Sequence, residues 1–386
     1  MDTATFLQLL HEEIGLTKQS GKKHIIHFQS TKDYFACRAE LRRMKSSLTH
    51  LSQVRDLSII HGFSCTLRPD TRLKETIGAH VIEEDTKVSV HQVVGKKIGI
   101  RRGNSFVGPQ MIPWGVEQIG APEVWNKSVG RSVRIGVIDT GIDYNHQDLR
   151  NSIARGVNLL NRSMMPYDDN GHGTHIAGTI AAASSSTGIL GVAPSALIHP
   201  VKAFDYNGSA YVSDIIAGID WCVQNDLDVI NMSFGMKTYS RSLEHAVMNA
   251  YYKGKVIVAS SGNDGKRKTV DYPARFPQVV SVGATTRLGK IAPFSNRGKQ
   301  IDIYAPGERI YSSWLHGKYN ELSGTSMATA HVSGVIALML SMKPNLGPLQ
   351  IKGILRRCAS SLSKRESTRW RPGQLNARRA LGALKT

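Results

Sequence analysis

The chain has 386 residues, of which 41% are hydrophobic, and a formal net charge of +19. This length favours one large domain together with a smaller one, and the hydrophobic fraction is enough for a substantial core. No apolar run reaches the roughly 18 to 20 residues that a membrane-spanning helix needs. The basic excess is concentrated after residue 350 and no nucleic-acid-binding motif accompanies it, so we expect a solvated tail and no nucleic-acid partner.

The first 23 residues are predicted to form a polar leader with one short helix, TFLQLLHEEIG. Glu12 and Glu13 interrupt this stretch, and no sustained apolar run marks a secretory signal. We therefore expect a cytoplasmic location, with non-classical secretion as the alternative. The four cysteines lie far apart without a CxxC spacing, which favours buried thiols over a disulfide framework.

Residues 24–91 are predicted to form a small α+β domain. The stretch HIIHFQS is typical of a strand, and the next stretch, DYFACRAELRRMKSSLTHL, is typical of an amphipathic helix with Phe35 and Leu41 among its inward residues. A βαββαβ-like order is completed by a strand at 57–67, a short helix at 73–80 and a closing strand at 80–92.

Residues 92–108 are rich in glycine and basic residues and show no periodicity. We expect an exposed linker there, which is a preferred site of proteolytic nicking. From residue 109 to 386 strands alternate with helices, beginning with the apolar strand SVRIGVID. Buried parallel strands joined by helices define an α/β fold, whose site lies at the carboxyl ends of the strands.

The stretch Leu322–Gly334, LSGTSMATAHVSG, is the most informative segment of this second part. Ser326 lies at the start of a predicted helix, where the positive helix end and small neighbours surround its hydroxyl. Serine is a poor nucleophile unless a base takes its proton. A base and an orienting carboxylate must therefore come from elsewhere in the chain.

Two other segments offer these groups. Asp139 ends the strand SVRIGVID, and His172 lies between two glycines at the start of the helical stretch HGTHIAGTIAA. His175 follows, but HGTH lacks the glutamate and the spacing of a zinc-binding helix, so we interpret His175 as a packed helix residue. The order Asp139, His172, Ser326 is that of subtilisin, and it differs from the chymotrypsin and α/β-hydrolase orders.

Together, VIDTGID, NGHGTHIAGT and GTSMATAHVSG resemble the three signature segments of subtilisin-like serine peptidases, and the resemblance runs from about Gln110 to near residue 360. It implies a three-layer α/β fold with a mainly parallel central sheet. It also implies a serine endopeptidase that cleaves proteins or peptides through an acyl-enzyme without an organic cofactor. Asn263, in SSGNDG, matches the family's oxyanion-hole asparagine. We expect a monomer.

The domain at 24–91 resembles the family's inhibitory propeptide, which implies an autoprocessed zymogen with its own propeptide as intramolecular inhibitor. Its ending, VIEEDTKVSVH, would place His91 at P1, the residue on the amino side of the cleaved bond. The predicted linker between this domain and the catalytic part, residues 92–108, is long. Its basic residues Lys97, Arg101 and Arg102 are further candidate cleavage sites if the P1 pocket is acidic.

The resemblance also implies the two edges of a substrate groove. Ser233, Phe234 and Gly235, in NMSFG, match the strand that pairs with an extended peptide. On the opposite edge lie Gly208 and Ser209, in YNGSAYV.

A pocket for the P1 side chain is implied as well. Ser260 and Gly262 resemble its walls, Asp271 stands at the floor where many relatives carry glycine, and Asp264 stands at the rim. Two carboxylates there would favour Lys or Arg at P1. The alternative is that both acids are solvent-facing loop residues.

A structural calcium ion is the expected metal. Calcium prefers six to eight hard oxygen ligands, and the residues that match the family's site are Gln110, Asp148, Ala183, Ser185, Thr187 and Ile189. Ser185 stands where relatives often have asparagine, which would weaken binding. A calcium-free turn is the alternative.

Two functions of other classes compete with this interpretation. A catalytically weak scaffold that binds peptides would fit Ala330, which stands where relatives usually have proline, but it has no need for Asp139, His172, Asn263 and Ser326 together. A basic nucleic-acid-binding protein would bind with a steep salt dependence, but it explains none of the signature segments.

Overall fold

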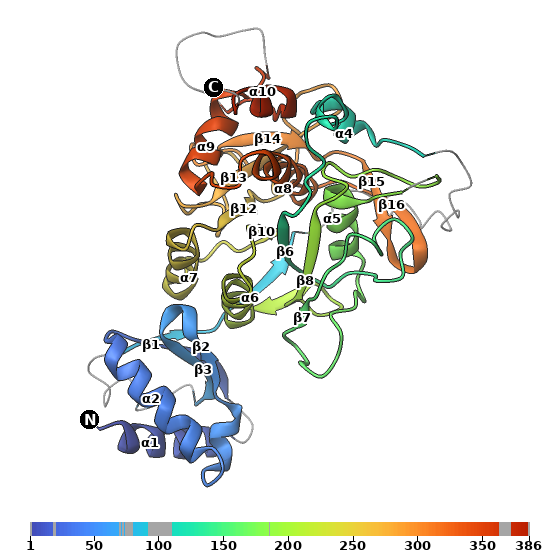
Figure 1. Ribbon diagram of the computed structural model, residues 1–386. Helices are drawn as coiled ribbons and strands as arrows, with labels where there is room; N and C mark the ends of the chain where they lie inside the picture. Colours follow the sequence, from blue (N-terminus) through green and yellow to red (C-terminus); the bar gives the residue numbers. More distant parts are fainter. Residues whose placement is uncertain are drawn as a thin grey trace.

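The computed structural model describes residues 2–17, 21–68, 71, 73, 80–91, 110–184, 186–362 and 372–384. Figure 1 shows a small N-terminal domain, drawn in blue, next to a larger domain that contains the rest of the chain. The predicted short helix at 73–80 lies almost entirely outside the described residues, and the predicted linker at 92–108 lies entirely outside them.

The small domain is a four-stranded antiparallel sheet packed against two helices. The strands follow the order β2-β3-β1-β4 across the sheet. The bounds are β1 (Lys22–Phe28), β2 (Arg55–Leu57), β3 (Gly62–Leu67), β4 (His80–Glu84), α1 (Thr3–Gly15) and α2 (Thr31–Met44), with 3₁₀ turns at Thr49–Gln53 and Ser58–Ile60.

Helix α1 packs into this domain, although the sequence suggests a leader that precedes it. Asp2 caps the helix by accepting hydrogen bonds from two amides of the first turn. One apolar stripe of the helix is buried in the same cluster as α2 and β3; it consists of Phe6, Leu7, Leu10 and Ile14. Burial of such a stripe is what stabilises a helix of this length in a protein.

Two predicted strands differ from the observed ones. The strand expected at 57–67 is divided into β2 and β3 because the chain turns back at His61, whose φ of 50° is left-handed. The strand expected at 80–92 is two strands, β4 and β5 (Lys87–Val90), which belong to different sheets.

The inward face of α2 also differs from the prediction. Phe35 is 51% exposed, whereas Tyr34, Cys37 and Leu41 are buried. These three residues recur at intervals of three and four, so they share one face of the helix, and Phe35 lies off that face.

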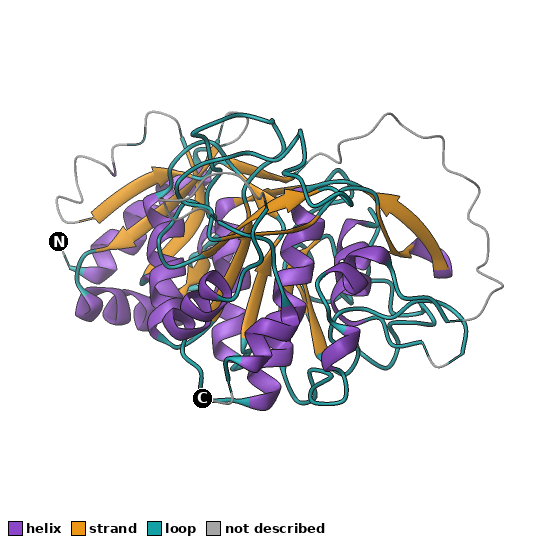
Figure 2. Cartoon of the chain, turned by 90° about the horizontal axis from the view of Figure 1, so that it is seen from above, coloured by secondary structure: helices purple, strands orange, loops and turns teal. Residues whose placement is uncertain are grey.

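The large domain is built on a seven-stranded sheet in which every adjacent pair is parallel. The strand order is β14-β13-β12-β10-β6-β8-β7. The bounds are β6 (Arg134–Asp139), β7 (Val157–Asn158), β8 (Leu197–Lys202), β10 (Val229–Met232), β12 (Val256–Ser260), β13 (Val280–Thr285) and β14 (Ile303–Pro306). Figure 2 shows these strands with helices packed against them.

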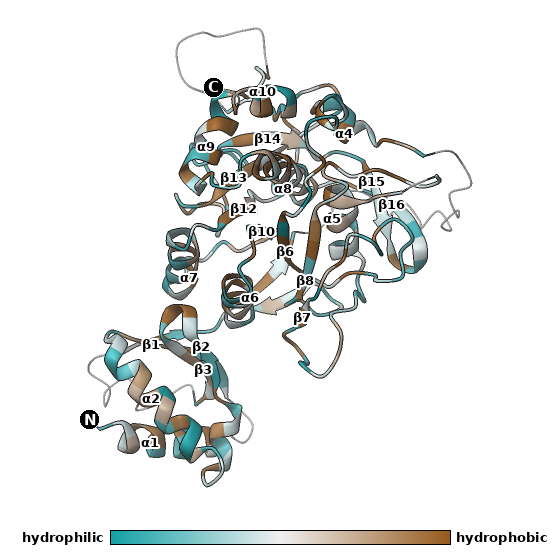
Figure 3. Cartoon of the chain, in the orientation of Figure 1, coloured by the Kyte–Doolittle hydropathy of each residue, from teal (hydrophilic) through white to brown (hydrophobic). Residues whose placement is uncertain are grey.

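Helices cover both faces of this sheet. Along β6, Ile135 and Val137 join the cluster that contains α5 and α8, whereas Ile138 joins the cluster that contains α6 and α7. This alternation produces the three layers, because successive strand residues point to opposite faces. The helices are α4 (Trp114–Gln118), α5 (His172–Ala181), α6 (Val212–Gln224), α7 (Arg241–Tyr252), α8 (Thr325–Met342), α9 (Pro348–Arg357) and α10 (Ala377–Gly382). Figure 3 shows hydrophobic residues, in brown, on β8 and β14, and hydrophilic residues, in teal, on parts of α2.

Helix α8 is a core helix. By length and composition it could cross a membrane, with a mean hydropathy of 1.3, but 89% of it is buried in the protein. It packs against α5 and against β10, β12 and β13 of the sheet. The four cysteines are unpaired, and three of them are buried, in line with the expected thiols.

Strand β5 connects the two domains. It lies between β11 (Phe234–Gly235) and β9 (Ser209–Tyr211) of the large domain and is antiparallel to both. A separate hairpin, β15 (Ile310–Trp314) and β16 (Lys318–Leu322), lies near α5. The segment that precedes the large domain in the sequence therefore fills the space between two strand edges of that domain.

Candidate active site

An aspartate and a histidine from two segments form a buried pair. Asp139 ends β6, and His172 is the first residue of α5. The His172 Nδ1 atom lies 2.8 Å and 3.0 Å from the two carboxylate oxygens of Asp139. Burial by itself lowers the pKa of His172, but the charge and hydrogen bonding of Asp139, with the charge of Asp168, raise that pKa above its ordinary value. The arrangement stabilises the imidazolium that a general base becomes after it takes a proton.

Asp168 fixes the position of His172 through the start of α5. One carboxylate oxygen accepts from the Gly171 amide at 2.9 Å and from the Thr140 hydroxyl at 2.8 Å. The other oxygen accepts from the amide and the hydroxyl of Thr174 at 2.9 Å and 2.6 Å. Asp168 thus satisfies donors at a helix N-terminus. Sequence reasoning missed this residue, although an acid shortly before a helix is itself a capping signal.

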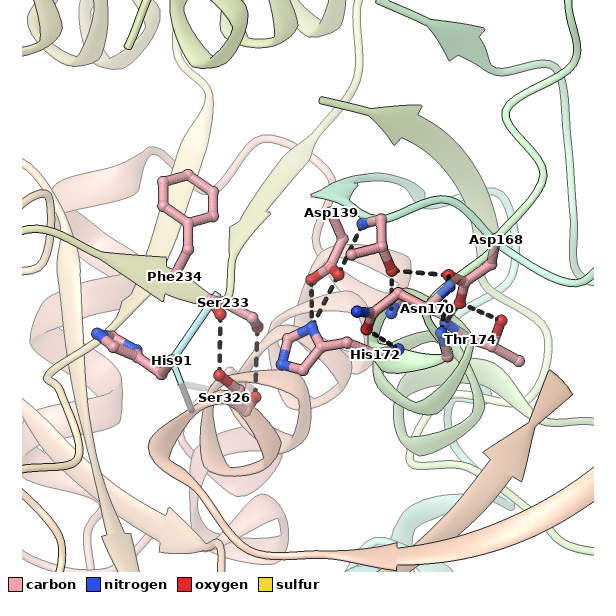
Figure 4. Close-up of polar contacts among 12 residues, drawn as sticks. His91, Asp139, Asp168, Asn170, His172, Thr174, Ser233, Phe234 and Ser326 are labelled. Carbon is pink, nitrogen blue, oxygen red and sulfur yellow. Dashed lines mark hydrogen bonds and ion pairs between the residues drawn. The ribbon is translucent and has the colours of Figure 1, made fainter. Parts of the chain in front are cut away.

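Ser326 is the second residue of α8. Its Oγ donates a hydrogen bond to the Ser233 carbonyl at 2.9 Å. Figure 4 shows His172 between Asp139 and Ser326, with the serine hydroxyl turned to Ser233. Within the described part of the chain, the buried Nε2 of His172 has no hydrogen-bond partner. The three residues of the Asp–His–Ser order are therefore brought together, although the serine is not bonded to the histidine.

Asn263 follows β12 and lies at the same helix end. Its Oδ1 accepts from the Thr325 amide at 2.9 Å and from the Thr325 hydroxyl at 2.8 Å. A Cβ on Gly324 would lie 3.1 Å from its Nδ2, so the side-chain amide lies close against the backbone before Ser326. The orientation of the carboxamide is set by these contacts.

The two predicted groove edges hold β5 as an extended peptide. Phe234 pairs with Val90 and Gly235 pairs with Ser89 on one side. On the other side Ser89 pairs with Ser209, and the Val90 amide donates to the Gly208 carbonyl at 2.9 Å. Backbone pairing of this kind is β-augmentation.

The residue after β5, His91, enters the predicted P1 pocket. Its Nδ1 lies 2.8 Å from Ser260 Oγ, and its Nε2 lies 3.0 Å from Asp271 Oδ2. Both His91 and Asp271 are buried, with 9% and 3% exposure. A neutral ring that donates from Nε2 to Asp271 can accept at Nδ1 from the Ser260 hydroxyl, so both polar edges of the ring have partners.

Two glycines make room in this pocket. A Cβ on Gly235 would lie 2.4 Å from His91 Nε2, and one on Gly262 would lie 2.6 Å from an oxygen of Asp271. Gly262 also has a φ of 105°, a conformation that side chains disfavour. The pocket therefore depends on the absence of side chains at both positions.

Lys237 is a pocket residue that sequence reasoning missed, because an isolated loop lysine carries no motif. Its Nζ lies 2.8 Å and 3.1 Å from the two oxygens of Asp271 and contacts Asp264 as well. Burial lowers the pKa of Lys237, but hydrogen bonds to Asp264 and Asp271 raise it above its ordinary value. The alternative of two solvent-facing acids fails for Asp271, which is buried.

The expected calcium ligands cluster around one loop. Asp148 Oδ2 accepts from the Ile189 amide at 3.0 Å, and the Ala183 amide donates to the Asp148 carbonyl at 2.8 Å. The Gln110 amide group donates to the Ser184 carbonyl. Thr187 belongs to the same loop, where its carbonyl accepts from the Ser184 hydroxyl. Ser185 lies outside the described residues.

This loop passes beside one carboxylate and contributes backbone carbonyl groups to its surroundings. A Cβ on Gly188 would lie 2.3 Å from Asp148 Oδ1, so the loop backbone passes directly over the acid. Among the described residues no group of three or more His, Cys, Asp or Glu could hold a metal ion. Carbonyl oxygens with a single carboxylate fit calcium chemistry and do not fit a transition metal.

His175 is a packed helix residue, as the sequence suggests. Its Nε2 lies 3.0 Å from the Ile310 carbonyl, and burial lowers its pKa to about 3. It therefore stays neutral at physiological pH.

The fold and the geometry define a class of protein, an α/β serine peptidase with its reaction centre at the carboxyl end of β6 and the start of α8. Comparison with known proteins agrees, since the profile of the subtilase family matches residues 130–380. The chain belongs to the subtilase family and is a serine endopeptidase of the subtilisin type.

Several curated relatives are similar over most of their length. Subtilisin DY from Bacillus licheniformis is 41% identical over 257 residues, which cover 66% of this chain and 93% of the relative. The thermostable alkaline protease of Halalkalibacterium halodurans is 38% identical over 316 residues, covering 80% of this chain and 81% of the relative. The alkaline protease of Shouchella clausii is 35% identical over 352 residues, covering 90% and 86%. That last match necessarily includes much of the small domain.

The same comparison corrects the expected location. The matched relatives are secreted extracellular subtilisins, which contradicts a cytoplasmic assignment. The expectation was wrong because it rested on the lack of a recognisable signal in the first residues of the sequence given, and such a lack does not decide where a protein acts.

Proposed function

We propose that Ser326, His172 and Asp139 carry out peptide-bond hydrolysis. Rotation of the Ser326 side chain moves its hydroxyl from the Ser233 carbonyl toward His172 Nε2. The serine oxygen then bonds to the substrate carbonyl carbon while His172 takes its proton, and Asp139 stabilises the resulting imidazolium. His172 returns the proton to the leaving amine as the C–N bond breaks. Water then hydrolyses the acyl-enzyme ester by the same route.

We assign Asn263 to the oxyanion of this reaction. Its Oδ1 accepts from Thr325, so the Nδ2 group of the same carboxamide is the donor that we assign to the oxyanion. Together with the Ser326 amide it would stabilise the charge that develops on the carbonyl oxygen. Loss of one such donor costs about 10² to 10³ in turnover, a magnitude known from a subtilisin.

The second part of the proposal is an autoprocessed zymogen. The observation that carries it is the position of β5 between β9 and β11 with His91 in the pocket, which is the pose of a bound substrate. The Glu83 carboxylate accepts from the Ser242 amide at the start of α7, and Asp85 accepts from the Ser213 amide at the start of α6. Both contacts favour docking of the small domain, because each carboxyl group satisfies a backbone donor at a helix N-terminus.

We infer that the first cleavage falls between His91 and Gln92, with Lys97, Arg101 and Arg102 as later sites. Asp271 at the pocket floor can bind P1 side chains that donate hydrogen bonds or carry positive charge. A substrate with Phe at P1 would leave the buried carboxylate without a donor from the substrate.

A calcium ion at the Gln110 and Asp148 loop belongs to the proposal as a structural cofactor. Gln110, Asp148 and the carbonyls of Ala183, Thr187 and Ile189 would hold it, with Ser185 as a further candidate. When bound, the ion would crosslink the chain before α4 to the loop after α5, away from the reacting atoms.

Mass spectrometry of the purified full chain tests the proposal. Wild type and the Ser326→Ala variant are incubated side by side with calcium, and the new N-terminus is read over time. We expect wild type to lose residues 1–91 first, while the variant stays intact. Two intact proteins would refute autoprocessing, and equal cleavage of both would assign it to a contaminating protease.

A further inference from the structure

Lys237 is a charged residue of the pocket that the proposed mechanism does not use. It follows β11 by two residues, and its ammonium group contacts both Asp264 and the buried Asp271. The Lys237 side chain is 53% exposed, whereas that of Asp271 is 3% exposed. The lysine therefore reaches from solvent to the floor of the pocket that holds His91.

Asp271 is shared between Lys237 and His91. Its Oδ1 lies 2.8 Å from the ammonium nitrogen, and its Oδ2 lies 3.1 Å from the same nitrogen and 3.0 Å from His91 Nε2. Two carboxylates and one ammonium leave the pocket with one net negative charge. A side chain that enters the pocket thus meets a carboxylate that already has an internal partner.

We propose that Lys237 is a specificity-determining residue that sets the charge selectivity of the P1 pocket. This inference rests on the proposed function, which assigns the pocket to P1. With an uncharged P1 side chain, Lys237 stays on Asp271 and keeps the buried carboxylate paired. With Lys or Arg at P1, the substrate cation and Lys237 compete for the same carboxylate. The pocket consequently accepts neutral P1 residues more readily than a pocket with two unpaired acids would.

The geometry makes this competition possible. A P1 cation bound to Asp271 would lie within a few ångströms of the ammonium of Lys237, where like charges repel strongly. The long, half-exposed stem of Lys237 allows it to move toward Asp264, whose side chain is 36% exposed at the rim. Movement in that direction keeps one ion pair and releases Asp271 to the substrate.

The test uses the full chain, which presents its own P1 residue. All variants carry Ser326→Ala. His91→Lys and His91→Met are each made in two forms, one with the native Lys237 and one with Lys237→Met, which keeps the stem and removes the charge. Protection of the Val90 amide against hydrogen exchange reports how firmly β5 is docked, because that amide donates to Gly208. Lys237→Arg, which keeps the charge, is the matched control.

With Lys237 or Lys237→Arg, we expect the two residue-91 variants to differ by less than about threefold in protection factor. With Lys237→Met, we expect the Val90 amide to be protected about tenfold more in His91→Lys than in His91→Met. The introduced ammonium group then pairs with Asp271 without competition. The same ratio of protection factors between the two residue-91 variants with Lys237, Lys237→Arg and Lys237→Met would overturn the inference.

This readout needs no catalysis, so it separates the two proposals. If a chain with intact Ser326 fails to self-process while the exchange ratio shifts as expected, the proposed autoprocessing is wrong and the effect of Lys237 on the charge selectivity of the pocket stands. If self-processing occurs and the exchange ratio does not shift, the proposed function stands and the role of Lys237 is refuted.

Discussion

The reaction centre and the P1 pocket lie on the same groove but hold their acids in opposite ways. Asp139 and Asp168 are buried and are satisfied by His172, hydroxyls and backbone amides; in the described part of the chain neither forms an ion pair with Lys or Arg. Asp271 is equally buried, but its ion-pair partner is the half-exposed Lys237. Buried groups thus position the chemistry, while a half-exposed ammonium group balances the charge of the pocket.

This difference predicts two kinds of mutant. Changes at the reaction centre should lower turnover for every substrate, whereas changes at the pocket should alter the ratio between substrates.

The largest effect is expected for Asp139→Asn. The amide cannot stabilise the imidazolium and allows the wrong tautomer of His172, so kcat should fall by about 10⁴-fold. Steady-state kinetics with peptides that carry Lys or Met at P1 should show the same loss for both. A loss below tenfold, or one confined to a single P1 residue, would break the distinction between the two regions.

A smaller effect concerns docking of the segment that carries His91. Burial raises the pKa of Asp85 to about 6, above its ordinary value of 3.8, and hydrogen bonds to Ser213 oppose that rise only in part. The docked state therefore favours the protonated acid. Docking should be strongest below pH 4, weaken as the pH rises to about 6, and stay constant above, with a total change of up to about 3 kcal/mol.

Hydrogen exchange of the Val90 amide in the Ser326→Ala chain measures this pH dependence. Burial lowers the pKa of His245, which packs against His27 at the same seam, so Asp85→Asn serves as the control that isolates the carboxylate. The variant should lose the decline between pH 4 and 6. A wild-type protection factor that rises over this interval would contradict the assigned sign.

A smaller effect, on the pH dependence of activity, is expected for Asp168→Asn. The charge of Asp168 helps to raise the pKa of His172, so its removal lowers that pKa. Because His172 must be neutral to act as a base, the acid limb of kcat/KM should move to lower pH. The neighbouring Asp169→Asn, which alters a half-exposed acid paired with Lys202, should leave that limb in place. A shift to higher pH would contradict the prediction.

Asp168→Asn should also destabilise the fold. The new amide places a donor against the Thr174 amide and hydroxyl, and loss of a cap typically costs about 1 kcal/mol. Thermal unfolding of Asp168→Asn and Asp169→Asn would measure this loss of stability.

The smallest effect on catalysis is expected from calcium. Removal of the ion with a chelator should lower Tm by several degrees, since a ligand at 100 times its Kd stabilises by about 2.7 kcal/mol. The ratio of activities toward Lys and Met at P1 should not change. Asp148→Asn should abolish the calcium dependence of Tm, and persistence of that dependence would place the ion elsewhere.

The sequence was informative where chemistry requires fixed residue types in fixed order. Asp139, His172 and Ser326 lie in short segments with a recognisable pattern of residue types, and the alternation of strands and helices predicts the layered sheet. The resemblance of VIEEDTKVSVH to a propeptide ending also predicts His91 at P1; the His91 ring lies beside Ser260 and Asp271, and its role at P1 stays a prediction.

Other features depend on contacts between distant segments, which local patterns do not contain. Lys237 gains its meaning only when its loop meets Asp271, and Phe35 has an apolar side chain that the fold leaves on the outside. The division of the closing strand into β4 and β5 follows from pairing with two different domains, and a continuous stretch of strand-like residues does not reveal it.

The central claim is that the catalytic residues are functional and that the chain's own β5 and His91 block them. Its most direct test follows hydrolysis of a peptide substrate by freshly purified full-length wild type, while mass spectrometry monitors residues 1–91 in the same sample. We predict a lag in hydrolysis that ends as these residues are lost, and no hydrolysis with Ser326→Ala. Full activity from the first time point with the chain intact would contradict the claim.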